Sequence, residues 1–178
     1  MGRRIAFFDE TRVVVGTTVR RCLARRGSRP RIRVNLGFQH FYVFLALDAI
    51  SRKVLYTLYN SLSSKNMKSF VYRMERKWGR ETKYLVLDNH SSHKTGAILD
   101  LFRRRGVRPV FTPKYSPELN PVERIFKDLK FHLANRFFNN VEEAREEVRR
   151  FFEEHHDQFN LDVVQYLDLD EIEVENNG

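Results

Sequence analysis

The sequence of 178 residues has little of what marks secreted, membrane or disordered proteins. Its single cysteine, Cys22, excludes an intrachain disulfide and favours a cytosolic setting. The longest purely apolar run, Phe41–Leu47, is far shorter than the roughly 20 residues that span a bilayer. Asp9 and Glu10 follow only four apolar residues, so the start lacks the apolar core of a secretory signal. With 8 Gly, 5 Pro and 42% hydrophobic residues, the chain is expected to fold as one domain.

Acidic residues are scarce in most of the chain. Residues 1–140 contain 29 Lys and Arg against 10 Asp and Glu, whereas residues 141–178 contain 3 against 13, and the net charge is +9. A basic body of this kind usually binds a polyanion, most often nucleic acid, because each neutralised phosphate releases counterions. The alternative is a basic protein that is merely soluble. We divide the chain into a domain at residues 1–158 and an acidic tail at residues 159–178, which docks as a strand, shields basic surface or is disordered.

Short runs rich in Val, Ile, Phe, Tyr and Thr predict strands in the first third of the chain. They cover residues 4–9, 12–19, 32–36, 40–48 and 53–60. Because turn residues separate these runs, we expect an antiparallel meander.

Helical spacing begins after these strands. Five apolar residues recur at the spacing of a helix: Met67, Phe70, Val71, Met74 and Trp78. Gly79 is expected to end that helix. The later elements are expected to be a buried strand at 84–87, a helix at about 92–105, a strand at 107–111 and helices at about 121–135 and 141–156. Strands followed by alternating helices and strands indicate an α/β fold, in which helices pack on a mixed sheet.

Two acids stand at the ends of apolar runs. Asp88 follows the run Tyr84–Leu87, and Asp9 follows the run Ile5–Phe8. A carboxylate at the end of a buried strand is costly unless a cation meets it, and sites in open α/β sheets lie beyond the carboxyl ends of strands. The two acids meet in one site if their strands are neighbours. Alternatively, each acid begins a turn or caps a helix.

Glu123 also has two interpretations. Asn120 as N-cap, Pro121 at the first helical position and Glu123 at the third form a start that is similar to a capping box. On the helix that follows, Glu123, Lys127 and Lys130 recur at i, i+4 and i+7, which would set a metal-binding carboxylate beside two phosphate-binding amines. The same line would be equally ordinary as a solvated surface.

Three carboxylates brought together repel one another, and divalent ions that prefer oxygen ligands, such as Mg²⁺, offset the repulsion. Two such ions can activate a water or a 3′ hydroxyl and stabilise the leaving oxygen in phosphodiester chemistry. A basic surface combined with an acidic cluster therefore predicts a nuclease that acts on nucleic acid. His90 and His93 could instead suggest zinc, but no Cys or further His cluster completes four ligands.

Three stretches carry a family resemblance: Phe7–Glu10, Tyr84–Lys94 and Tyr115–Glu123. They resemble the catalytic domain of DDE-superfamily insertion-sequence transposases, in the branch related to mariner elements. The 34 residues between Asp88 and Glu123 match the spacing that this branch favours. The resemblance implies a ribonuclease H-like fold with a mixed five-stranded sheet flanked by helices.

The resemblance also implies an activity. Asp9, Asp88 and Glu123 would form the catalytic and metal-binding triad, with Asp9 bridging two Mg²⁺ or Mn²⁺ ions and the other two acids holding one each. The domain would then cut DNA and transfer the cut strand without a covalent enzyme intermediate. The alternatives are a structure-specific endonuclease on the same fold, which hydrolyses but does not join strands, and an inactive DNA-binding remnant.

The expected partners are the DNA of the element ends and of the target. Relatives carry an N-terminal helix-turn-helix region, whereas this chain starts close to its first catalytic strand. We therefore expect either a separate helix-turn-helix polypeptide that binds the ends or a truncated copy of a transposase. The resemblance implies a homodimer on DNA and a prokaryotic cytoplasm, where the protein associates with the nucleoid. No membrane is expected to take part.

Basic residues in several regions are expected to bind DNA. They are Arg25, Arg26, Arg29 and Arg31 in an arginine-rich hairpin, His93 and Lys94 beside the second acid, Lys114 in the Pro-containing loop, and Lys127 and Lys130 on the helix of Glu123. The alternative for the hairpin is a solvated sheet edge. The resemblance implies that His93 and Lys94 lie near the active site, where they would contact phosphate or the residues around a metal ion, and the alternative for them is an exposed helix start.

Overall fold

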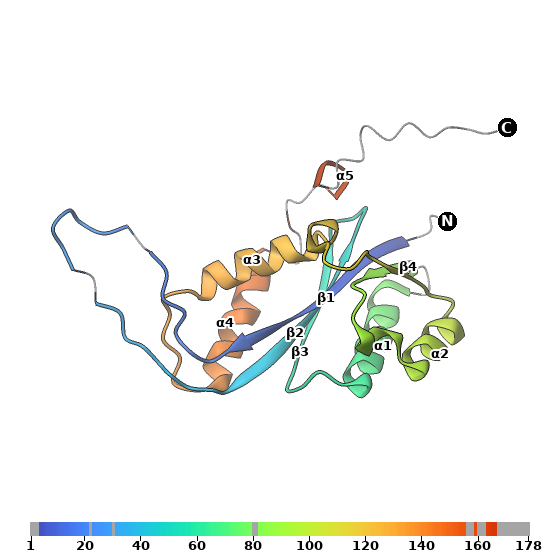
Figure 1. Ribbon diagram of the computed structural model, residues 1–178, viewed down its shortest axis with the longest axis horizontal. Helices are drawn as coiled ribbons and strands as arrows, with labels where there is room; N and C mark the ends of the chain where they lie inside the picture. Colours follow the sequence, from blue (N-terminus) through green and yellow to red (C-terminus); the bar gives the residue numbers. More distant parts are fainter. Residues whose placement is uncertain are drawn as a thin grey trace.

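Figure 1 shows the computed structural model, which describes residues 4–21, 23–29, 31–79, 82–155, 159 and 163–166. The strands are β1 (Arg4–Val14), β2 (His40–Asp48), β3 (Val54–Tyr59), β4 (Thr82–Leu87) and β5 (Arg108–Phe111). The α-helices are α1 (Ser64–Trp78), α2 (Gly96–Arg105), α3 (Val122–Leu133), α4 (Val141–Glu154) and α5 (Val163–Tyr166). Two short 3-10 turns, η2 (Ser91–Lys94) and η3 (Pro117–Leu119), precede α2 and α3.

The strands form one mixed sheet in the order β3-β2-β1-β4-β5, with β1 at its centre. β1 runs antiparallel to β2, with Asp9 opposite Leu45, and parallel to β4, with Phe7 opposite Val86. β2 and β3 are antiparallel, and β4 and β5 are parallel. The predicted α/β fold, a five-stranded sheet in which an antiparallel meander is followed by parallel strands, is confirmed.

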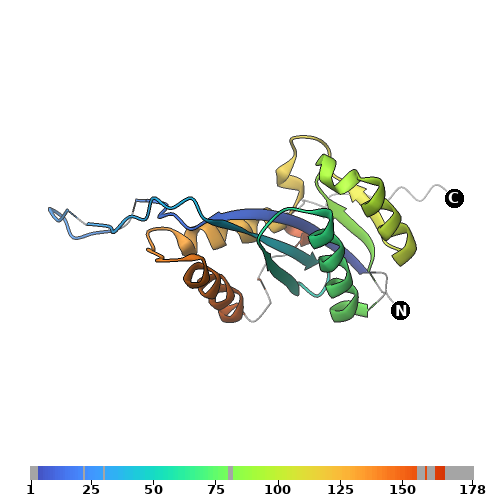
Figure 2. The same ribbon diagram turned by 90° about the horizontal axis from the view of Figure 1, so that it is seen from below.

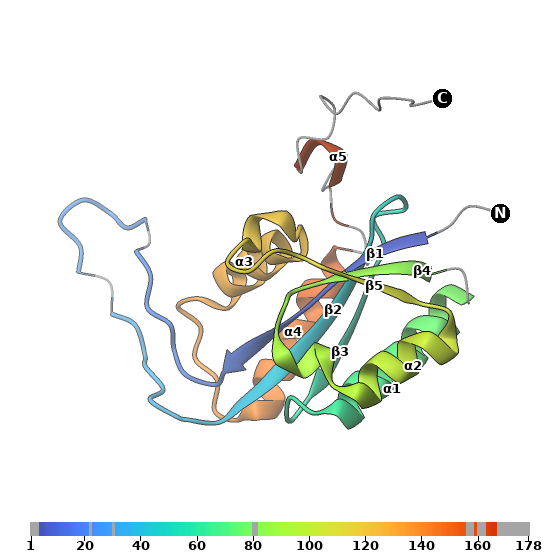
Figure 3. The same cartoon turned by 45° about the vertical axis from the view of Figure 1, so that its right-hand side comes forward.

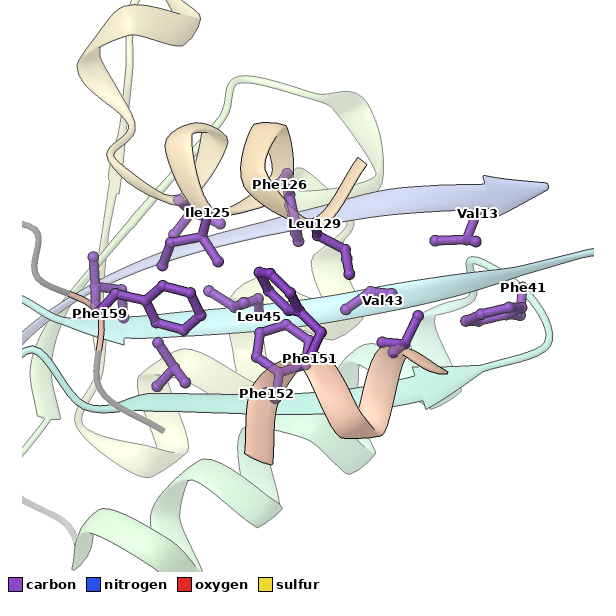
Figure 4. Close-up of a cluster of buried hydrophobic side chains, with 14 of the residues drawn as sticks. Val13, Phe41, Val43, Leu45, Ile125, Phe126, Leu129, Phe151, Phe152 and Phe159 are labelled. Carbon is purple, nitrogen blue, oxygen red and sulfur yellow. The ribbon is translucent and has the colours of Figure 1, made fainter. Parts of the chain in front are cut away.

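Alternation of side chains along β1 divides the core into two clusters. Phe7 packs in the cluster that contains side chains of α3 and α4, whereas Phe8 packs in the cluster that contains side chains of α1 and α2. Helices therefore cover both faces of the sheet (Figure 2). Figure 4 shows side chains of β2, α3 and α4 that meet in the first cluster: Val43, Leu45, Phe126, Leu129, Phe151 and Phe152. Full burial of one such side chain stabilises the fold by about 1.5–3 kcal/mol.

The first strand is longer than the sequence predicted, because it includes residues 12–14 of the second predicted strand. The prediction is wrong for the rest of that strand, residues 15–19, and for the strand at 32–36. β1 runs without a break to Val14, whereas residues 15–39 form a long connection, here called the arm, that projects away from the sheet (Figure 3). Two backbone hydrogen bonds, from Val15 N to Gln39 O and from Thr17 N to Asn35 O, continue the pairing for a short distance. Val13 and Val15 are still buried in the core, but the apolar side chains farther along the arm are not covered. Val19 is 60% exposed and Leu36 is 82% exposed. Propensity without burial does not make a strand there.

Several helix ends follow the predicted signals. Gly79 and Gly106 take positive φ angles of 70° and 67° directly after α1 and α2, which few residues other than glycine adopt readily. The predicted helix at 92–105 is interrupted, because Thr95 has extended backbone between η2 and α2. This break turns residues 91–94 back toward the end of β4.

The beginning of the expected tail packs on the domain. Phe159 and Val163 are buried in the cluster of α3 and α4. The other residues of 159–178, apart from α5, lie outside the described residues, so the boundary at residue 158 stays a prediction. Within the part of the chain that the structure describes, no helix is both long enough and apolar enough to span a membrane.

Candidate active site

The central strand carries the first acid. Asp9 lies in the middle of β1, and alternation places its half-buried side chain on the same face as Phe7, toward α3. The backbone N–H of Glu10 donates a hydrogen bond of 2.8 Å to Asp9 Oδ1. Asp9 thus lies on the central strand, opposite Leu45 of β2 and two residues beyond Phe7, the last residue of β1 in register with β4.

The second acid directly follows β4. Oδ1 of Asp88 accepts a hydrogen bond from the His90 N–H at 3.1 Å and lies 2.6 Å from Nδ1 of His93. About half of the Asp88 side chain is exposed, at 49%. The parallel pairing of β1 with β4 brings this strand end beside Asp9, as the sequence predicted for neighbouring strands.

The third acid lies in the first turn of α3, and Asn120 positions that turn. The buried Asn120 side chain donates to Phe8 O at 3.0 Å and accepts from Val122 N at 3.2 Å. The start of α3 is therefore tied to β1 at the residue before Asp9. The predicted capping box is wrong in one respect, because no hydrogen bond in the described part of the chain engages the Glu123 carboxylate.

Asp9, Asp88 and Glu123 line one cavity of about 450 Å³. The loop after β5 and the turn η3 supply much of the remaining wall, including Thr112 and Lys114. Within the described residues, no group of three Asp, Glu, His or Cys side chains is arranged to hold one metal ion. Mutual repulsion of the carboxylates favours such separation. That the three acids bind metal stays a prediction.

Burial and the neighbouring charges shift the pKa values of the acids in the site. Burial, and next the charges of Glu123 and Glu10 and a smaller effect of Asp88, raise the pKa of Asp9 to about 8. The hydrogen bond from His93 lowers the pKa of Asp88 in spite of its partial burial. A cation beside Asp9 would relieve the repulsion and restore its charge.

His93 has a place that the sequence did not predict. It is only 3% exposed, and its ring nitrogens contact two carboxylates, Nδ1 that of Asp88 and Nε2 that of Glu10 at 2.9 Å. Burial opposes the charge of this ring, but the hydrogen bonds to Asp88 and Glu10 outweigh it and raise the pKa of His93 to about 10. In this arrangement both ring nitrogens contact carboxylates, and a contact of His93 with DNA stays a prediction.

Glu10 was missed as a site residue. It is adjacent to Asp9 in sequence, but alternation places it on the opposite face of the sheet, with Phe8. Its contact with His93 joins residues that are 83 positions apart. The only sequence signal was that Glu10 is adjacent to Asp9. That adjacency does not predict a contact with His93, which is seen only in the structure.

The basic residues expected to bind DNA lie in different surroundings. Lys114 lines the cavity, and the ammonium of Lys94 lies 4.8 Å from the centre of the Phe111 ring. Lys127 and Lys130 are exposed on α3. Arg25, Arg26, Arg29 and Arg31 are all exposed on the arm, where Cys22 and Pro30 lie outside the described residues.

The base of the arm is fastened to the connection between α3 and α4. The Asn35 amide donates to Phe138 O at 2.6 Å, and Arg20 N donates to the side chain of Asn135 at 2.7 Å. The guanidinium of Arg33 lies 4.1 Å from the centre of the Phe137 ring. These contacts fix where the arm leaves the domain.

Known proteins share this sequence pattern and fold. Residues 4–145 match the model of a family described as DDE superfamily endonuclease. A stretch of 64 residues is 36% identical to the transposable element Tcb1 transposase of Caenorhabditis briggsae and covers 32% of this chain and 23% of that protein.

Two solved structures show the fold. The Mos1 mariner paired end complex with Mn matches with a TM-score of 0.71 at 18% identity, over 92% of this chain and 52% of that chain. The catalytic domain of Mos1 mariner transposase matches with a TM-score of 0.67 at 17% identity, over 93% of this chain and 77% of that chain. The chain thus spans about half the length of the Mos1 chain in the paired end complex and less than a quarter of Tcb1.

Proposed function

The chain belongs to the DDE superfamily endonucleases, and from this premise we propose that it is a transposase catalytic domain that cuts DNA and joins a cut end to a second DNA site. One observation carries the proposal: Asp9, Asp88 and Glu123, which are far apart in sequence, line the same cavity. The strongly basic composition of residues 1–140 supports DNA as the substrate.

The donor set fits two Mg²⁺ or Mn²⁺ ions, because all three side chains offer the hard oxygen ligands that these ions prefer. Asp9 would supply oxygen ligands to both ions, and Asp88 and Glu123 would each hold one. The pKa of Asp9 supports this assignment, since burial and the charges of both other acids raise it. One solved Mos1 mariner paired end complex is described with Mn and another with Mg. When bound, such ions supply an activated hydroxyl and stabilise the leaving oxygen.

The residues of the chain have separate tasks in this reaction. Asn120 sets the distance between the helix of Glu123 and the strand of Asp9, so that the acids are positioned before DNA binds. Lys114 supplies positive charge at the cavity, where a phosphate would lie. Lys94, Lys127 and Lys130 extend the basic surface around it, and the arm arginines Arg25, Arg26, Arg29 and Arg31 contact DNA farther from the cavity.

The assembly is part of the proposal. We expect a homodimer that brings two element ends together and a separate helix-turn-helix polypeptide that recognises them. The insertion-sequence branch and a nucleoid-associated location in a prokaryote rest on the motif resemblance. Solved Mos1 structures include a paired end complex and a strand transfer complex, which supports a DNA-bound assembly of this kind.

The main alternative is an endonuclease that hydrolyses DNA without joining it, and one assay separates the two functions. The full chain is incubated with Mg²⁺, a duplex that carries the DNA flanking its gene, a plasmid target and any helix-turn-helix polypeptide encoded beside it. Transposase activity yields cut ends covalently joined to the plasmid, whereas an endonuclease yields cut ends alone. Asp88→Asn is expected to abolish both products while DNA binding persists. DNA binding without either product would favour an inactive remnant.

A further inference from the structure

A buried histidine links the two faces of the sheet at the candidate active site. Nε2 of His93 lies 2.9 Å from one Glu10 carboxylate oxygen and 3.2 Å from the other, and Nδ1 lies 2.6 Å from Asp88 Oδ1. Glu10 comes from β1 and Asp88 from the end of β4, the two strands that lie side by side in Figure 3. His93 is thus the only described residue that contacts both carboxylates through its side chain.

The ring is held on every side. The 3-10 turn η2 folds back so that His93 N donates to His90 O at 3.1 Å, which directs the side chain toward the sheet. Phe8 packs edge-on against the imidazole, with 5.8 Å between ring centres. The side chain of Glu10 is only 12% exposed, so its bond to Nε2 is largely shielded from water. A rotated ring would lose both carboxylate contacts at once.

The contacts also orient Asp88. Within the described residues, the hydrogen bonds that the Asp88 side chain accepts, from His90 N and from His93, both engage Oδ1. The carboxylate group is therefore fixed about its last torsion, and Oδ2 is the oxygen left for a ligand in the cavity. Glu10 has no contact with Asp88 in the described structure and reaches it only through the ring. Ligand carboxylates in metal sites are commonly oriented by such outer hydrogen bonds.

We propose that Glu10 and His93 are positioning residues, in which Glu10 fixes the His93 ring and the ring holds Asp88 in the orientation that metal binding requires. This inference rests on the proposed metal site. It assigns a task to a carboxylate that faces away from the cavity and that no motif spacing had singled out.

The test uses two substitutions of His93 that keep different halves of the link. Asn places an amide nitrogen near the position of Nδ1, so His93→Asn retains a donor for Asp88. Gln places it near Nε2, so His93→Gln retains the contact with Glu10 only. Titration of the full chain with Mn²⁺, followed by the electron paramagnetic resonance signal of the free ion, gives the affinity without any catalytic assay.

The proposal expects His93→Gln to weaken Mn²⁺ binding by about 10- to 100-fold and His93→Asn to weaken it by less than about tenfold. A role in packing alone predicts the reverse order, because Gln fills more of the ring's volume than Asn. Equal affinities in the two variants, the reverse order, or tighter binding in His93→Gln would each overturn the proposal. Melting temperatures of both variants report whether the fold is kept.

Glu10 is tested in the same way. Glu10→Gln keeps an oxygen that accepts from Nε2 and is expected to bind Mn²⁺ within about threefold of the original chain, whereas Glu10→Ala is expected to bind about tenfold more weakly. Wild-type affinity in Glu10→Ala would contradict the proposed role. Asp9→Asn and Asp88→Asn test the metal site itself. If they leave Mn²⁺ binding unchanged, the proposed function fails, independently of the result for Glu10 and His93.

Discussion

Replacement of Asp9 with Asn is expected to stabilise the metal-free protein near neutral pH. Burial, followed by the charges of Glu123, Glu10 and Asp88, raises the pKa of Asp9 in the folded protein to about 8, against an ordinary value of 3.8. Between these pH values, the folded protein keeps a proton that the unfolded chain has released. The free energy of unfolding therefore falls as the pH rises through this interval. Asn has no charge and escapes this penalty.

The magnitude follows from the two pKa values. Each pH unit is worth about 1.4 kcal/mol, so at about pH 7 the carboxyl of Asp9 destabilises the fold by up to about 4 kcal/mol. The substitution keeps an oxygen for the Glu10 N–H, which lies 2.8 Å from Asp9 Oδ1. Even complete loss of that hydrogen bond would cost only about 1 kcal/mol. We therefore expect Asp9→Asn to gain about 2–4 kcal/mol at about pH 7.

Urea unfolding in the presence of a metal chelator measures this gain as a function of pH. The gain is expected to be largest above about pH 8 and to vanish below about pH 4, where the carboxyl is protonated in both states. Asp128→Asn, which removes an exposed acid of α3, is the matched control and is expected to change stability by less than about 0.5 kcal/mol at every pH. A gain in Asp9→Asn that is equal at both pH values, or no gain at all, would refute the reasoning, because a packing effect does not titrate in this range.

Three further predictions concern the site and its DNA. Glu123→Gln is expected to stay folded and to bind DNA, while Mg²⁺-dependent cleavage falls by orders of magnitude, because a neutral amide does not replace a charged metal ligand; full cleavage by the folded variant would remove Glu123 from the triad. Asn120→Ala is expected to cost about 1–3 kcal/mol in urea unfolding, since it leaves Phe8 O and Val122 N without their buried partner, and to reduce cleavage further than this loss explains. Replacement of the four arm arginines named above with serine is expected to weaken binding to DNA duplexes of unrelated sequence by similar factors. The slope of log K against log salt concentration, measured by fluorescence anisotropy, is expected to become smaller by up to about 3–4. An unchanged slope would place the arm away from DNA.

Local signals predicted much of the fold. The helical period ending at Gly79 gives α1, and the short apolar run before Asp88 gives the buried strand β4. The convergence of Asp9, Asp88 and Glu123 was also accessible, because the strands before Asp9 and Asp88 could be neighbours and the motif spacing carried a family resemblance for Glu123. In each case, the residue types and the tertiary packing favour the same structure. The expected strand end at Asp9 was wrong, since Asp9 lies in the middle of β1.

The remaining features depend on contacts between distant residues. Segments 12–19 and 32–36 have the composition of strands, and only the lack of a covering layer leaves most of them outside the sheet. The burial of His93 depends on the break at Thr95 and on Glu10, which is far away in sequence. No periodicity reports such a contact, so the sequence left open whether His93 contacts phosphate, lies among the residues around a metal ion or is exposed at a helix start.

The attachment of α3 to β1 has a consequence for chains that differ in loop length. Asn120 and the apolar face of α3 fix the position of Glu123, and neither depends on how many residues separate β5 from the helix. The connection after Thr112 is mostly exposed, with Tyr115 at 98%, and doubling the length of a flexible loop costs only about 0.6 kcal/mol. Insertions there would leave the third acid in place. Proteins with different intervals between their second and third acids are thus able to place the third acid at the same point, provided that each keeps an amide that ties the helix to the central strand. The cavity wall that residues 112–117 form would differ between such proteins.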